Sequence, residues 1–295
     1  MARRTILLVA TLAAVGIAGY VARTHSNVPP VQATAGEDAA ASPAPISRPL
    51  HQERRAVAQL GSVELARKTM EFEALKQRAK QGDAAAQREL ALTYEKCVEA
   101  NYRQDEFVTL YEWKSQHTRD PSQAAARMRT ARERATVCKS VDGGAVVPSE
   151  LIAGWLEQAA RNGDLAAQAR VAAFTGRSFD EGEANQFIER VVKSNDPAAM
   201  FMMGILAGGP ALEATGQKYN HVVTSSIDTH AWMAVGCRMG YDCSASGDVM
   251  GTLCLDTGIC EQDFEDVLRS GFKSDKETQE FDRKVAEISR LVQEK

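Results

Sequence analysis

One short phrase occurs three times in this chain and limits its possible folds more than any other feature. The copies read KQGDAAAQ from Lys80, RNGDLAAQ from Arg161 and KSNDPAAM from Lys193. Gly and Asn readily adopt the left-handed conformation that ends a helix. The Asp that follows accepts hydrogen bonds from the free N–H groups at the start of the next helix. Each copy therefore predicts a turn between two antiparallel helices.

The spacing of these turns predicts helix pairs in an irregular array. The turn residues are Gly82-Asp83, Gly163-Asp164 and Asn195-Asp196. Repeated turns of this kind are typical of a helical solenoid. The three aspartates are 81 and 32 residues apart, which does not fit a uniform repeat. We therefore expect an all-α fold of antiparallel helix pairs, stacked as a short, irregular solenoid or bundle.

The composition agrees with an all-α fold. Aromatic residues make up only 6% of the chain, whereas a β-sandwich or barrel needs many Val, Ile and aromatic residues. The 35 Lys and Arg residues are balanced by 39 Asp and Glu residues, for a net charge of −4. This balance argues against a protein dedicated to binding nucleic acid.

The stretch from Trp155 to Gln168, WLEQAARNGDLAAQ, resembles the Sel-like repeats of the tetratricopeptide superfamily. The family pattern is an aromatic residue, an Ala pair, Gly-Asp or Gly-Asn, and then Ala-x-x-Leu. The resemblance covers residues 71–241, with Asn195 in place of the usual Gly. Residues 231–240 resemble a first helix whose partner is remodelled around cysteines. The resemblance implies a protein of the bacterial cell envelope that binds peptides or proteins, and therefore an adaptor role.

The long interval between the first two turns leaves room for further helices. Asp120 and Pro121 have the pattern of a helix start. Residues 141–148 have the composition of a loop, with Ser149 as the cap of the next helix. Residues 211–226 are expected to form a second loop.

Six cysteines suggest disulfides and an oxidising compartment. In two pairs the cysteines are separated by five residues that include a Gly, at positions 240 and 258. A Gly after a helix can reverse the chain and bring the second Cys back to the last turn. This favours the pairs Cys237–Cys243 and Cys254–Cys260 and leaves Cys97–Cys138, with crossed pairing within the group of four as the main alternative. A zinc site is less favoured because the spacing is wider than usual.

The first 23 residues have the pattern of an export signal. Arg3 and Arg4 precede an apolar run over residues 6–22, which is close to the minimum length for a membrane-spanning helix. Tyr20 stands where a cleavage site needs a small residue. We therefore expect residues 1–23 to remain as a signal anchor in the inner membrane, with the rest of the chain in the periplasm. A cleaved signal peptide and a secreted protein are the alternative.

The remaining chain divides into a tether and a helical domain. Residues 24–50 are rich in Pro, Ala and Ser, which predicts a disordered tether. The helical repeat domain covers residues 51–295 and has a Cys-rich portion at 237–260. A capping helix is predicted at 274–293, because apolar residues recur there at helical spacing opposite a charged face. These apolar residues are Phe281, Val285, Ile288 and Val292.

One dense basic cluster is a candidate binding surface. It consists of Arg127, Arg129, Arg132 and Arg134. These side chains would contact an anionic partner, such as lipid headgroups or an acidic wall polymer. The alternative is an ordinary solvated helix face.

The three tryptophans fall into two groups. Trp155 and Trp232 occupy the aromatic position of the Sel-like pattern, so we expect them in the core. Trp113, close to Tyr111, is freer to contact a partner. The candidate binding residues are therefore Tyr111, Trp113, Arg127 and Arg134.

The sequence shows no distinct catalytic or metal-binding pattern. It lacks a Gly-x-Ser-x-Gly motif, and His221 and His230 have no partners at ligand spacing. Carboxylates such as Glu150 and Glu157 cannot be told apart from surface charges. We therefore expect no catalytic residues, no cofactor and no metal. The expected function is an exported, non-enzymatic interaction module that binds another envelope protein or peptide. A cell-wall-acting hydrolase or an enzyme inhibitor is the alternative.

Overall fold

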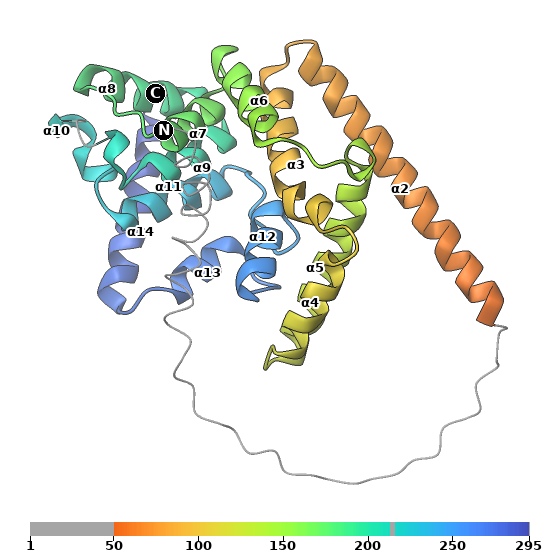
Figure 1. The fold of residues 1–295 in the computed structure, drawn as a ribbon. Helices are drawn as coiled ribbons and strands as arrows, with labels where there is room; N and C mark the ends of the chain where they lie inside the picture. Colours follow the sequence, from red (N-terminus) through yellow and green to blue (C-terminus); the bar gives the residue numbers. More distant parts are fainter. Residues whose placement is uncertain (1–49, 213–215, 295) are drawn as a thin grey trace, which may run out of the picture.

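The computed structural model describes residues 50–212 and 216–294, and side chains from residue 61 onward. Within these ranges all regular secondary structure is helical (Figure 1), which confirms the predicted all-α class. The predicted signal anchor and nearly all of the tether lie outside the described residues. No helix in the described part is both long and apolar enough to span a bilayer.

Most of the helices are joined by short connections. Some of the connections contain a turn of 3-10 helix. The α-helices are α2 (Leu50–Lys80), α3 (Ala84–Tyr102), α4 (Phe107–Gln116), α5 (Pro121–Ser140), α6 (Ser149–Arg161), α7 (Leu165–Thr175), α8 (Glu181–Ser194), α9 (Pro197–Leu206), α10 (Gly216–Tyr219), α11 (Ser226–Arg238), α12 (Asp248–Thr257), α13 (Phe264–Ser270) and α14 (Asp275–Gln293). The 3-10 turns are Asp142–Gly144, Pro210–Leu212 and Asn220–Val222.

The three predicted turns are confirmed, and they join α2 to α3, α6 to α7 and α8 to α9. At each turn the Asp side chain accepts a hydrogen bond from a backbone N–H in the first turn of the next helix. The bonds run from Ala86 N to Asp83 (3.0 Å), from Ala167 N to Asp164 (2.7 Å) and from Ala198 N to Asp196 (2.9 Å). The residue before each Asp has a positive φ angle, which is 93° at Gly82, 96° at Gly163 and 58° at Asn195.

A second side chain stabilises two of these turns. Gln87 and Gln168 stand four residues after the capping Asp. Each donates an amide N–H to a backbone carbonyl of the preceding helix, Ala79 and Ala160 respectively, at 3.0 Å. These carbonyls lie in the last turn of their helix, where intrahelical partners run out. At the third turn Met200 takes the same position and is buried in the core.

An inserted helical hairpin explains the long interval between the first two turns. The α4–α5 hairpin lies between α3 and α6 in sequence, yet α3 still packs directly against α6 (Figure 1). A disulfide between Cys97 and Cys138 joins α5 to α3. The other disulfides are Cys237–Cys243 and Cys254–Cys260, so the favoured pairing is the one observed.

Two local predictions were wrong. Ser149 is the first residue of α6, and Pro148 stands at the capping position without a side-chain hydrogen bond. The described part of residues 211–226 contains short helical turns instead of a plain loop. Such turns are too short to carry an apolar period that a sequence could reveal.

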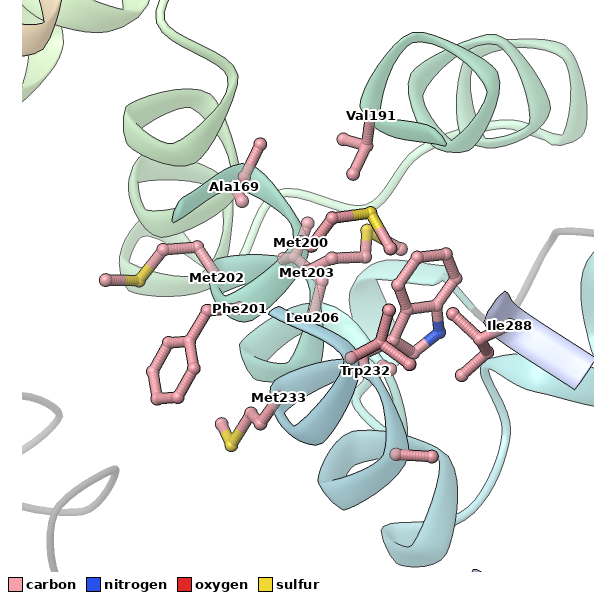
Figure 2. Close-up of a cluster of buried hydrophobic side chains, with 14 of the residues drawn as sticks. Ala169, Val191, Met200, Phe201, Met202, Met203, Leu206, Trp232, Met233 and Ile288 are labelled. Carbon is pink, nitrogen blue, oxygen red and sulfur yellow. The ribbon is translucent and has the colours of Figure 1, made fainter. Parts of the chain in front are cut away.

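The larger hydrophobic core is built around Trp232 of α11, which is fully buried as predicted. Its indole Nε1 donates a hydrogen bond to the carbonyl of Val222 at 2.7 Å. Figure 2 shows the indole between Met200 and Met203 of α9 and Ile288 of α14. The amphipathic face of α14 thus closes one side of this core.

The smaller core is formed mainly by α2 to α6. It includes the buried residues Phe72, Leu90 and Tyr94. Trp155 is half-buried at its edge, so it belongs to the core only in part. Leu255 of α12 also packs into this cluster, and the Cys-rich segment therefore connects the two cores.

Close approach of α9 and α11 yields a stability prediction. A Cβ atom added at Gly236 would lie 2.6 Å from the backbone N of Phe201, which cannot move without shifting α9. We expect Gly236→Ala to lower the free energy of unfolding by about 1–3 kcal/mol, as overpacking does. The matched control is Gly154→Ala in α6, where a Cβ meets nothing within 4 Å. Urea denaturation should show no loss for the control, and equal losses for both variants would contradict the prediction.

Candidate binding groove

Tyr111 and Arg127, two of the predicted binding residues, are buried, with exposed fractions of 1% and 7%. The Tyr111 hydroxyl lies 3.3 Å from the carboxylate of Glu99. Burial and the nearby carboxylates raise the pKa of Tyr111 above its usual value. The Arg127 guanidinium donates to the carbonyl of Leu255 at 3.2 Å through Nε. Neither side chain is available to a partner, so their assignment as binding residues was wrong.

The other arginines of the basic cluster are also occupied within the protein. Arg134 donates to the carbonyl of Lys96 and to the hydroxyl of Thr252, both at 3.2 Å. Arg129 and Arg132 are exposed and lie beside Glu261 and Glu112 respectively. Arg134 is only partly exposed, and its role in binding stays a prediction.

The physical reason is that α5 docks the Cys-rich segment. The C-terminal end of α12 presents carbonyl groups without helical partners, and a cation placed there is stabilised. Arg127 fills this position, and Gln123 of α5 also accepts a hydrogen bond from Cys260 N at 2.7 Å. Four arginines on one helix reveal a charged face, but they do not reveal which segment covers it.

Trp113 is exposed, as the sequence analysis expected. Its side chain is 58% exposed, and its ring lies 4.4 Å from the ring of His117 between centroids. The residues before and after it carry opposite charges. A role of Trp113 in binding stays a prediction.

The structure shows a different candidate site, a groove between α6, α7 and α8. It has a volume of about 490 Å³ and is open to solvent. We call it the α6–α8 groove. Its apolar floor is formed by Val171, Ala172, Phe179 and Phe187, and its rim carries Glu157, Arg161, Arg177, Glu183 and Arg190.

Two phenylalanines and two arginines form one continuous stack in this groove. The Phe179 and Phe187 rings are stacked with their centroids 5.5 Å apart. The Arg177 guanidinium lies 4.8 Å from the Phe179 ring, and that of Arg190 lies 5.5 Å from the Phe187 ring. Cations over aromatic faces are attracted by the ring quadrupole. The stack therefore fixes where both guanidinium groups lie.

The local backbone holds the stack in place. Phe179 lies in the link between α7 and α8, and its N–H donates to the carbonyl of Ala211 at 3.0 Å. The next residue, Asp180, caps α8 by accepting from Glu183 N at 2.8 Å. Phe187 follows two turns later on α8 and is almost fully buried. The groove is thus built on anchored elements.

The rim carries three arginines and only two glutamates. Arg177 pairs with Glu183 at 2.9 Å, and Arg161 lies 3.5 Å from Glu157 on the same helix. Arg190 is exposed, and no carboxylate among the described residues lies within ion-pair distance of it. The groove is therefore locally positive in a chain whose net charge is −4.

A second cleft, between α3 and the start of α12, has a volume of about 330 Å³. Two of its four charged lining residues, Arg88 and Asp248, form ion pairs with residues outside the cleft. Arg88 pairs with Asp164 at 3.0 Å, and Lys96 pairs with Asp248 at 2.7 Å. This cleft is therefore best explained as a junction within the protein.

The α6–α8 groove was not predicted from the sequence because its residues come from three helices and a link. One local pattern marks it in retrospect. Arg177 and Phe179 alternate directly before the capping Asp180, and Phe187 and Arg190 are three residues apart on one helix. Phe187 and Arg190 share a helix face at this spacing, whereas Arg177 and Phe179 lie in the link between α7 and α8.

The described side chains include no group of three or more His, Cys, Asp or Glu placed to hold a metal ion. The chain matches no protein-family model, no curated protein and no solved structure. Its function must therefore be inferred from its own residues and geometry.

Proposed function

We propose that this chain is an exported, non-enzymatic adaptor of the bacterial cell envelope. Residues 6–22 anchor it in the inner membrane, and its helical domain binds a segment of another envelope protein in the periplasm. The observation that carries this proposal is the open α6–α8 groove, which is lined by the α6–α7 pair and by α8, the first helix of the next pair. Repeated helix pairs characteristically present such extended concave surfaces for binding.

Three further features support the proposal. An apolar floor with a polar rim is the arrangement of protein-binding surfaces. The three disulfides suit an oxidising compartment such as the periplasm. The resemblance of residues 71–241 to Sel-like repeats favours a protein or peptide as the partner.

Site-specific crosslinking in intact cells tests this function. A photo-crosslinking residue at Gln186, which lines the groove, is expected to give one discrete adduct with another envelope protein. The matched control is Lys276, an exposed residue near the start of α14. The other end of α14 lies beside α8 (Figure 1). Lys276 should give no such adduct.

Other outcomes would contradict the proposal. The same adducts at both positions, or none at either, would exclude the groove as a specific protein-binding site. Release of soluble fragments from wall polymer by the purified protein would favour a hydrolase. An adduct with an enzyme whose activity falls on binding would favour an inhibitor.

A further inference from the structure

We propose that the segment bound in the α6–α8 groove is acidic, and that its carboxylates are held by Arg177 and Arg190. This inference rests on the proposed function, because it names the chemistry of the partner at that same groove. It follows from how the two guanidinium groups are held, from the weakness of their present partners and from the local charge.

The stack prepares both arginines to bind carboxylates. A guanidinium that lies over a ring uses its face for that contact and keeps its N–H donors at the edge. The guanidinium carbons of Arg177 and Arg190 lie 4.8 and 5.5 Å from the centroids of the Phe179 and Phe187 rings. The planar fork of donors matches the two oxygens of a carboxylate. Since the rings already restrict these side chains, binding loses less side-chain entropy.

The present partners of the rim arginines are weak competitors. The Arg177–Glu183 and Arg161–Glu157 pairs join side chains that are about half exposed. Ion pairs in such positions contribute little to stability, so an incoming carboxylate can displace or join them. Arg190 keeps its edge donors free of any carboxylate among the described residues.

The charge of the surroundings favours the same partner. Other exposed arginines, such as Arg283 and Arg129, lie beside carboxylates that balance them. In the groove three arginines face two glutamates, and complementary charge selects partners and speeds association. Val171 and Ala172 on the floor can receive an apolar side chain next to the acidic one.

A selection from short random peptides displayed on phage tests the inference, with the oxidised, full-length protein in detergent micelles as the target. The enriched peptides should be acidic. Synthetic, fluorescently labelled copies should bind about tenfold more weakly to Arg177→Gln and to Arg190→Gln, because each variant loses a charge-assisted hydrogen bond. The matched control is Arg283→Gln, an exposed, ion-paired arginine of α14, which should leave the affinity unchanged.

The outcomes separate this inference from the proposed function. Neutral or basic peptides that crosslink to a photo-reactive residue at Gln186 would overturn the acidic partner and leave a protein-binding groove. Acidic peptides whose affinity is the same for both Arg variants would also overturn the role of these arginines. If no peptide is enriched, or if none crosslinks at Gln186, both proposals fail.

Discussion

Replacing Lys284 with Met is expected to lower the free energy of unfolding by about 3–5 kcal/mol. The Lys284 ammonium lies 2.7 Å from Oδ1 of Asp228, which is completely buried. The other carboxylate oxygen accepts hydrogen bonds from Thr224 N at 3.0 Å and from Ser225 N at 2.8 Å. Without Lys284 this carboxylate remains buried with no counter-charge. An unpaired buried charge costs far more free energy than an empty apolar site.

Urea denaturation of the oxidised protein measures this loss. The control is Arg283→Gln on the same helix, which removes only exposed ion pairs with Glu280 and Glu287. It should leave the denaturation midpoint nearly unchanged. The double variant Asp228→Asn/Lys284→Met should lose less free energy of unfolding than the two single variants lose together, because the two groups interact directly. If Lys284→Met and Arg283→Gln behave alike, the buried pair does not hold α14 in place.

Removing the Cys97–Cys138 disulfide should have the second large effect, a loss of about 4 kcal/mol. These cysteines are 41 positions apart. A crosslink that closes a loop of this length removes much of the conformational entropy of the unfolded chain. The double variant Cys97→Ala/Cys138→Ala also frees α5 from α3, so we expect faster hydrogen exchange in the α4–α5 hairpin. Urea denaturation and hydrogen exchange together measure the two effects.

The matched control is Cys237→Ala/Cys243→Ala, whose cysteines are only 6 positions apart. The same loop-entropy argument gives a loss of about 2 kcal/mol for this short loop. A larger loss for the short loop would show that local packing, and not loop closure, determines how these crosslinks stabilise the protein.

Sequence reasoning succeeded where the determining interactions are local. The Gly-Asp and Asn-Asp turns were predictable because one residue needs a positive φ angle and its neighbour caps the next helix. The disulfides of the Cys-rich portion were predictable because a Gly lies between the two cysteines of each pair. Gln87 and Gln168 hold equivalent positions in two copies, so their shared hydrogen bond could also have been anticipated.

Sequence reasoning failed where distant segments meet. The arginines of α5 suggested an anionic partner, but Arg127 donates to the Leu255 carbonyl of the same chain. Tyr111 was misjudged for the same reason, since the helices packed on α4 hide it. The α6–α8 groove was missed because Phe179 and Phe187 come together only when the link after α7 folds back. No periodic pattern encodes such contacts.

The docking of α12 onto α5 has a consequence for the order in which the chain folds. Arg127 and its carbonyl partner at Leu255 are separated by 128 positions, so the α4–α5 hairpin depends on residues that are synthesised much later. Contacts between such distant positions form slowly, because the chain between them must first be closed into a loop. The hairpin therefore acquires its final surroundings only when the Cys-rich segment arrives, and until then Arg127 must remain hydrated.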